Sequence, residues 1–243
     1  MSGEFSVPGQ IDGRFVINKF GRNPDIDTGS LPEDIWDAGG VYTGFPTGSA
    51  EALRITSSSA ADAAAGTGAR TVRIYGLDGN YAQINEDVTL NGTSNVVTTQ
   101  TFLRVYRALV ATAGSGLTNA GDITIRHNVT TGNIFSLMLA GKGQAEQANY
   151  TIPAGFTGYM VGYSASMFDI TSNNAELAIF TRDFGGAVRL RSPFVISETA
   201  GLSRERYRGL QFNEKTDLTF RCYEIVNSNG DVTVSWDMLL VPN

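Results

Sequence analysis

The amino-acid sequence predicts an all-β protein, in its most specific form a jelly-roll-like antiparallel β-sandwich with an extended N-terminal arm. Apolar and polar residues alternate with a period close to two along many short segments from residue 40 onward. Turn dipeptides that tolerate positive φ separate these segments, namely Asp78-Gly79, Asn91-Gly92 and Asn229-Gly230. No window offers the i, i+3, i+4 apolar spacing of a long amphipathic helix, so we expect little helix.

Residues 1–35 are predicted to form the extended arm, because they are rich in Gly, Asp and Pro and only Arg14 to Phe20 resembles a strand. The spacing of Ser30 and Glu33 is that of a capping box, which predicts a short helical turn before residue 35. Extended segments of this length commonly wrap partners. The residues expected to make such a partner contact are Phe15, Ile17, Phe20, Ile35 and Trp36.

Residues 36–243 are predicted to form the sandwich from roughly twelve or more strands. Alternation is visible in chain order at Val72 and Ile74, Val88 and Leu90, Ile123 and Ile125, Tyr159 to Tyr163, Leu177 and Ile179, and Val188 and Leu190. The segment from Phe102 to Val110 is apolar on both faces, which indicates a central strand. The clearest alternation runs from Val232 to Leu240. A single sandwich and a division into two subdomains near residues 140–150 both stay open.

The charge balance argues against several classes of partner. The formal net charge is −6 and the pI is about 4.8, so approach to a phosphate backbone is unfavourable, and Arg204, Arg206 and Arg208 form the only tight basic cluster. We therefore expect no nucleic-acid partner. The apolar runs fall far short of the roughly 18 residues of a membrane span, and residues 1–5 do not resemble a secretion signal. We expect no membrane contact and synthesis in the cytoplasm.

The residues on which catalysis most often depends are scarce. The single cysteine, Cys222, allows neither an intramolecular disulfide nor a thiolate zinc cluster, and its strand position predicts a core residue. The single histidine, His127, would have to serve any Ser-His-Asp device, and we expect it to be a partly exposed residue at a strand end. No P-loop, dinucleotide-binding or nucleophile-elbow motif is present. We therefore expect no enzyme activity and no cofactor.

Carboxylates and aromatic residues offer the remaining candidate sites. The pairs Glu33–Asp34 and Glu86–Asp87 could serve glycoside hydrolysis, although neighbouring residues of a strand point to opposite faces. Asp25 and Asp27 alternate as calcium ligands do, but the Gly and Glu of an EF-hand loop are missing, and a turn with solvated acids is the competing interpretation. Sugar binding by exposed aromatic residues is a further possibility, the candidates being Tyr42, Phe45, Tyr75, Tyr81, Tyr150, Tyr159 and Tyr163.

Several runs between roughly residues 15 and 165 carry a resemblance to a known class of proteins. The runs are Asn18 to Asp27, Glu33 to Tyr42, Ala65 to Asp78 and Glu86 to Gly92, with shorter ones at Arg104 to Arg107, Gly121 to Ile125 and Ile152 to Gly155. In these runs the chain resembles virion structural proteins of marine tailed bacteriophages. The motifs are structural signatures, and they do not indicate whether the chain belongs to the head, the neck or the tail.

The resemblance implies a non-enzymatic virion protein that assembles in the host cytoplasm. The first hypothesis is a head decoration or cement protein, a homo-oligomer and by analogy a trimer, that bridges copies of the major capsid protein or other virion proteins through its N-terminal region. The alternative hypothesis is a receptor- or glycan-binding module of a tail or head appendage.

Overall fold

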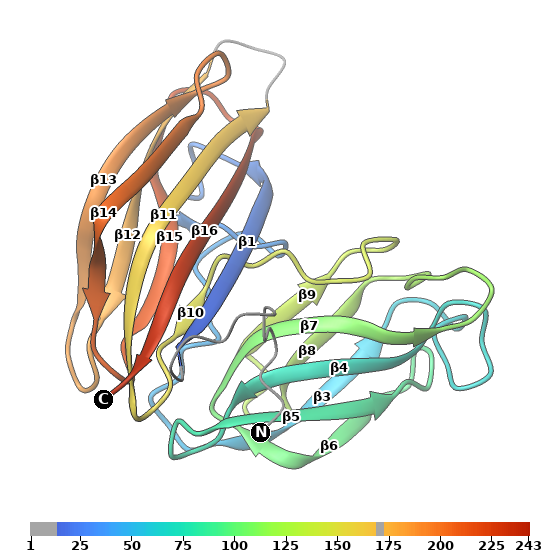
Figure 1. Ribbon diagram of the computed structural model, residues 1–243. Coiled ribbons are helices and arrows are strands. Elements are labelled where there is room, and N and C mark those ends of the chain that lie inside the picture. Colours follow the sequence, from blue (N-terminus) through green and yellow to red (C-terminus); the bar gives the residue numbers. More distant parts are fainter. Residues whose placement is uncertain (1–13, 169–172) are drawn as a thin grey trace. The chain divides into compact units, whose positions relative to one another are not determined.

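The computed structural model describes residues 14–168 and 173–243, and these residues form sixteen strands and no helix (Figure 1). All strand pairs are antiparallel. The predicted all-β, antiparallel, sandwich-like fold is therefore confirmed. Within the described residues no helix has the length and apolar character needed to cross a membrane.

The chain divides into two compact units, and one is inserted into the other. Unit 1 comprises the chain up to Val41 and from Ala148 to Asn243, whereas unit 2 comprises Tyr42–Gln147. An insertion has two boundaries, and only the second of them falls in the region 140–150 that the sequence suggested. The residues before the first boundary belong to unit 1.

Unit 1 is built from two sheets. The first has the order β1-β16-β11-β14, and the second has the order β10-β15-β12-β13, with β2 also pairing with β15. The strands of the first sheet are β1 (Phe15–Ile26), β16 (Gly230–Pro242), β11 (Phe156–Phe168) and β14 (Leu202–Phe212). Those of the second are β2 (Glu33–Asp34), β10 (Tyr150–Thr151), β15 (Asp217–Ile225), β12 (Asn174–Arg182) and β13 (Val188–Ser197).

The strand order of unit 1 is that of a jelly roll. Both β2 and β10 pair with β15, so they can be taken together as one interrupted strand. Unit 1 then has eight strands, and when these are numbered 1 to 8 in chain order the two sheets have the orders 1-8-3-6 and 2-7-4-5. This is the double Greek key of jelly rolls. Unit 2 is inserted into the chain between β2 and β10, the two pieces of that interrupted strand.

The expectation of a free arm over residues 1–35 is wrong for the part that the structure describes. Phe15–Ile26 forms β1, which pairs with β16 along its length in continuous register from Phe15↔Leu240 to Asn23↔Val232. The segment lies in the sheet because every second residue of β1 pairs with a buried residue of β16 and so shares its core-facing side. Residues 1–13 of the predicted arm lie outside the described residues.

Gly21 marks how closely β1 is covered. A Cβ atom at Gly21 would lie 2.3 Å from the backbone N of Ala148 and 2.5 Å from the backbone O of Ile35. These two residues bond to each other, since the Ala148 N–H donates to the Ile35 carbonyl at 3.0 Å. The backbone that crosses β1 therefore requires glycine beneath it.

The core of unit 1 follows the alternation that the sequence showed most clearly. Val232, Val234, Trp236, Met238 and Leu240 all face inward and are at most 1% exposed. The indole N–H of Trp236 donates to the backbone carbonyl of Ala148 at 2.9 Å, so the one polar atom of this side chain is satisfied.

Unit 2 is a second, smaller sandwich. One sheet has the order β6-β3-β8-β9 and the other has the order β5-β4-β7. The strands are β3 (Glu51–Ser57), β4 (Ala69–Leu77), β5 (Gln83–Thr89), β6 (Val96–Phe102), β7 (Arg104–Ala113), β8 (Ile123–His127) and β9 (Ile134–Met138). The core includes Leu53, Ile55, Val72, Ile74, Phe102, Ile123, Ile125, Phe135 and Met138.

The sequence predicted a central strand at β7, and this is wrong, because β7 lies at the end of its three-stranded sheet. Its outer edge is covered by an irregular segment rather than by a strand. The Val110 N–H donates to the Gly143 carbonyl at 2.8 Å, and the Ala145 N–H donates to the Ala108 carbonyl at 3.0 Å. Residues 104–108 of β7 are nevertheless all buried, so burial of both faces does not by itself make a strand central.

Candidate functional site

The most distinctive surface of unit 1 is formed by two neighbouring strands, each of which is the last strand of one of the two sheets. β13 ends one sheet and β14 ends the other, and a short turn joins them through a bridge between Ser197 and Ala200 (Figure 1). Together the two strands carry five arginines, Arg189, Arg191, Arg204, Arg206 and Arg208, which we call the arginine edge. Glu205 is the only acidic residue on either strand. This edge is therefore locally basic in a chain of net charge −6.

A bulge in β13 directs two of these arginines toward the gap between the sheets. Leu177 pairs with Phe194 and Ile179 pairs with Arg191, so Ser192 is left without a partner on β12, and its φ is 62°. Cross-strand partners share a face, and Ile179 is fully buried. Arg191 and, two residues earlier, Arg189 therefore stand on the face that the core residues occupy farther along the strand.

A larger bulge in β14 exposes a tyrosine. Met160 pairs with Leu210 and Gly162 with Glu205, so the four residues 206–209 stand opposite the single residue 161 of β11. Tyr207, within this bulge, has a relative exposure of 104%. A fully exposed aromatic side chain on a bulged edge strand is a typical feature of a binding surface.

Two arginines of β14 reach toward the same gap. Arg204 pairs with the buried Tyr163, and its guanidinium carbon lies 5.9 Å from the centre of that ring. Arg206 donates from Nη2 to the Ser192 hydroxyl at 2.8 Å and lies 5.8 Å from the same ring. Its Nε is buried and has no hydrogen-bond partner in the described residues.

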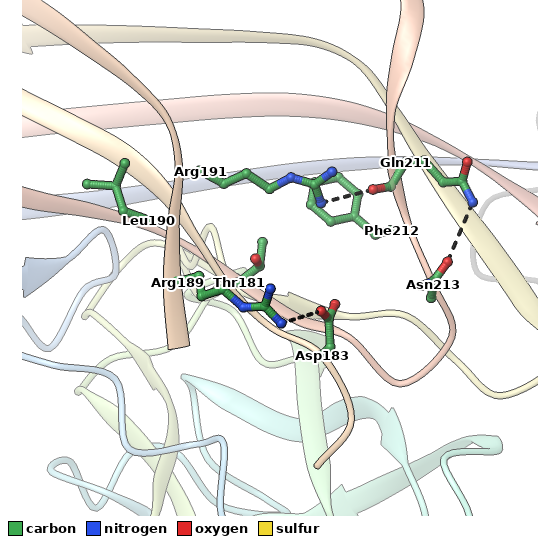
Figure 2. A pocket seen from close by; sticks show the side chains of 8 residues that line it. All are labelled: Thr181, Asp183, Arg189, Leu190, Arg191, Gln211, Phe212 and Asn213. Carbon is green, nitrogen blue, oxygen red and sulfur yellow. Dashed lines mark hydrogen bonds and ion pairs between the residues drawn. The ribbon is translucent and has the colours of Figure 1, made fainter. Parts of the chain in front are cut away.

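An open cleft of about 510 Å³ lies at one end of this edge (Figure 2). Figure 2 shows the Arg191 side chain extended along the Phe212 ring, with its guanidinium carbon 5.0 Å from the ring centre and Nη1 donating to the Gln211 carbonyl at 3.0 Å. Arg189 pairs with Asp183 at 3.1 Å, and both side chains are at least half exposed. One arginine over an aromatic ring, with a second arginine beside it that also pairs with Asp183, is an arrangement that can hold an anionic group.

The residues predicted for partner binding are divided between core and surface. Ile35 and Trp36 are 0% and 3% exposed, so they belong to the core of unit 1 and not to an exposed arm. Phe15, Ile17 and Phe20 are half-buried on β1. Contact of these three side chains with a partner stays a prediction.

The weak calcium candidates do not form part of a larger acidic cluster. Asp25 is exposed, and its backbone N–H donates to the Asn23 side chain at 3.2 Å. Asp27 accepts the backbone N–H of Asn229 at 3.1 Å. Among residues 14–168 and 173–243 no group of three or more His, Cys, Asp or Glu residues forms a possible ion site.

Glu33 and Asp34 do not act as a pair. Glu33 accepts hydrogen bonds from the Ser30 hydroxyl, the Asn23 amide and the backbone N–H groups of Asp27 and Gly40. Burial raises the pKa of Glu33, but these donors outweigh burial, and the pKa lies below 4.5. The predicted helical turn is wrong, because the residues from Ser30 to Glu33 form no helix and the Glu33 carboxylate is used to fix the loop.

Asp34 belongs to β2 and makes a different contact. It is fully buried and forms a two-pronged ion pair with Arg221, at 2.7 Å to Nε and 2.9 Å to Nη2. The second carboxylate pair is divided in the same way. Glu86 accepts the backbone N–H groups of Thr99 and Gln100, and Asp87 forms a two-pronged pair with Arg73.

His127 and Cys222 are both structural. His127 is 1% exposed, which corrects the expectation of a partly exposed residue. Its Nε2 donates to the Phe102 carbonyl at 3.0 Å, because a carbonyl only accepts, and Nδ1 accepts from the Asn133 amide at 3.2 Å. Cys222 is fully buried, and burial raises the pKa of its thiol to about 12.

The sequence analysis identified only part of this edge. It singled out the arginines of β14 only as a cluster and did not include Arg189, Arg191 or Tyr207. The alternation in Val188-Arg189-Leu190-Arg191 places two arginines on one face of a strand, but it does not show whether that face is turned inward or outward. Four of the aromatic residues proposed for sugar binding are instead buried, namely Tyr42, Tyr81, Tyr150 and Tyr163.

Comparisons with known proteins give no family. No protein-family model matches the chain, and no curated protein matches it. Among solved structures, the VP2 subviral particle of infectious bursal disease virus aligns over 95% of this chain and 81% of its own, at 11% identity and a TM-score of 0.14. The Gt strain of the same virus aligns over 100% and 85%, at 9% identity and the same TM-score. Similarity this weak supports no argument about function.

Proposed function

We propose that this chain is a non-enzymatic structural protein of a phage virion, and specifically a head decoration or cement protein that binds and stabilises the capsid shell. The sequence resemblance over residues 15–165 supports this assignment. The jelly roll of unit 1 is compatible with it, since jelly rolls occur in viral capsid and lectin domains, although a fold does not define a function.

The observation that carries the proposal is how the chain uses its candidate catalytic carboxylates. All four are engaged with donors that fix loops or neighbouring strands: Glu33 with Ser30 and backbone groups, Asp34 with Arg221, Glu86 with backbone groups, and Asp87 with Arg73. Glu33 and Asp34 are 3% and 0% exposed, so moving either carboxylate out of its contacts would disrupt the local fold. This use of acids supports a structural role.

The proposed mechanism is non-covalent and multivalent. Each copy, within a homo-oligomer for which three copies are the working hypothesis, contacts the major capsid protein or another virion protein. Repetition across a lattice multiplies weak contacts into strong retention on the particle. The protein needs no cofactor, nucleic acid or membrane for this role, and it joins the virion in the host cytoplasm.

The test is reconstitution on particles. Purified protein is added to phage heads that lack it, and the heads are imaged by cryo-electron microscopy. Regular density at symmetry axes of the shell is the expected result. Density only at the tail, or no density at all, would overturn the decoration assignment.

A receptor- or glycan-binding module is the second candidate, and the exposed Tyr207 beside the arginine edge favours it. Aromatic stacking combined with guanidinium groups suits acidic sugars. A glycan array separates the two candidates. Binding to acidic glycans that is lost in Tyr207→Ala would support this alternative.

A further inference from the structure

We propose that the free edge of β13 binds an extended acidic protein segment, which pairs with β13 as an added strand and places its carboxylates against the arginine edge. This inference rests on the proposed function for the identity of the partner, a neighbouring virion protein. The existence of the site rests on the geometry of unit 1 alone.

The first support is the position of β13 in its sheet. β13 pairs with β12 on one side, and on its other side no strand of the described residues pairs with it. Such an edge presents a row of backbone N–H and C=O groups that can pair with another chain. Pro193 has no N–H to donate, so the pairing is expected mainly over residues 188–192.

The second support is the charge on the face turned toward the gap. Arg189 and Arg191 lie on this face, and the side chains of an added strand would lie about 4.5–5.5 Å from their cross-strand partners, measured between Cβ atoms. Arginine pairs with carboxylates through two parallel hydrogen bonds. Arg206 of β14, whose Nη2 donates to the Ser192 hydroxyl of β13 at 2.8 Å, adds a third positive charge close to this strand. Acidic residues at alternate positions of the ligand satisfy this arrangement.

The third support is the opposite face of β13, which is apolar and exposed. Val188, Leu190 and Val195 are 55%, 47% and 57% exposed. Residues of the ligand that alternate with its acids would lie beside these side chains. The expected ligand is therefore an extended segment in which Asp or Glu alternates with Val, Ile or Thr.

Inward-pointing charges on an edge strand also serve a protective role, because they prevent sheets from pairing edge to edge. The two roles predict opposite results with an acidic partner. Protection alone predicts no binding, whereas a binding site predicts an affinity that depends on both the arginines and the backbone of the ligand.

The experiment is a fluorescence-polarisation titration of the full chain with a labelled peptide of alternating Glu and Val. We expect saturable binding that weakens with salt. Arg189→Gln combined with Arg191→Gln should weaken it by about tenfold or more, the equivalent of about 1.4 kcal/mol. Arg126→Gln, on β8 of unit 2, removes the same kind of charge elsewhere and should leave affinity unchanged.

Two further measurements separate strand addition from charge attraction alone. A peptide of equal charge with proline in place of valine cannot pair as a strand and should not bind. Hydrogen exchange should show protection of backbone amides within 188–192 only when the Glu–Val peptide is bound. Absence of binding, equal binding of the proline peptide, or an equal effect of Arg126→Gln would each overturn the inference.

The outcome is independent of the particle experiment. Peptide binding without attachment to phage heads would overturn the decoration role and leave the β13 site intact. Attachment to heads that persists in the double arginine variant, together with no peptide binding, would overturn the β13 site alone.

Discussion

Replacing Asp62 with Asn removes a carboxylate that is fully buried in unit 2. Its Oδ1 accepts the backbone N–H groups of Ala69 at 2.7 Å and Ala120 at 2.8 Å. Its Oδ2 accepts the backbone N–H of Gly121 at 2.9 Å and the Ser57 hydroxyl at 2.6 Å. One side chain therefore joins the start of β4 to the loop before β8.

The loss of stability expected for Asp62→Asn follows from these four hydrogen bonds. Asparagine keeps one acceptor oxygen, and its amide group would face the Gly121 N–H with a second donor. A hydrogen bond to a charged group contributes about 1.5–3 kcal/mol, and a buried donor left unpaired costs about 1–3 kcal/mol. These contributions overlap, so we expect Asp62→Asn to lower the free energy of unfolding of unit 2 by about 2–4 kcal/mol.

The effect of pH on this difference has a definite sign. Burial raises the pKa of Asp62, but its hydrogen-bond donors outweigh burial, and the pKa in the folded protein lies below 3.8. A lowered carboxyl pKa adds stability that is fully present above the pKa of the unfolded chain and is lost as the pH falls through the folded value. The difference between the two proteins should therefore be constant near neutral pH and shrink below about pH 4.

Urea unfolding followed by far-UV circular dichroism, with hydrogen exchange of peptides that cover 57–70 and 118–123, measures the effect. Trp36 and Trp236 both lie in unit 1, so tryptophan fluorescence follows that unit separately. Asp122→Asn is the matched control, since its Oδ1 accepts one exposed hydrogen bond. A change below about 0.5 kcal/mol for Asp62→Asn, or one equal to the control, would refute the reasoning.

Three further predictions concern unit 1. Arg221→Ala should lower its free energy of unfolding by about 3–5 kcal/mol, because the fully buried Asp34 loses its counter-charge; an unchanged urea midpoint in tryptophan fluorescence would contradict this. Cys222 should resist alkylation at pH 8 in the folded protein and react in urea, because burial raises its pKa to about 12; rapid labelling of the native protein, followed by mass spectrometry, would show the thiol to be accessible. Gly21→Ala should lower the free energy of unfolding by about 1–3 kcal/mol or more, because the added Cβ would lie 2.3 Å from a backbone nitrogen. Gly48→Ala is the control and should be nearly neutral in thermal unfolding, because a Cβ there would have no atom within 4 Å; equal effects of the two variants would refute the close approach at Gly21.

Local patterns were sufficient for the elements of the fold. The alternation from Val232 to Leu240 identified β16 and the face that it buries, because successive side chains of a strand point to opposite sides. The same argument failed for β7. Two apolar faces predicted a central strand, but both faces of residues 104–108 are buried although β7 ends its sheet, because packing on the faces is independent of pairing at the edge.

Only part of the candidate site could be predicted from the sequence. The cluster of arginines on β14 could be read from their spacing, whereas Arg189 and Arg191 join them only because a bulge at Ser192 changes which residues face inward. A bulge is decided by the register against a neighbouring strand. No local pattern in β13 specifies that register.

The sequence by itself determined that the chain is a β protein with short strands, tight turns and an acidic balance of charge, because these properties depend on neighbouring residues and on composition. The tertiary structure decided that Phe15–Ile26 is a strand and not an arm, that residues 42–147 are inserted as a second sandwich, and that β13 and β14 end their sheets together. The pairing of β1 with β16 joins residues more than 200 positions apart, as in the bond of Asn18 to Asp237 across 219 positions. Such pairings are selected by the burial of complementary faces over the whole unit, and this selection leaves no local trace in the sequence.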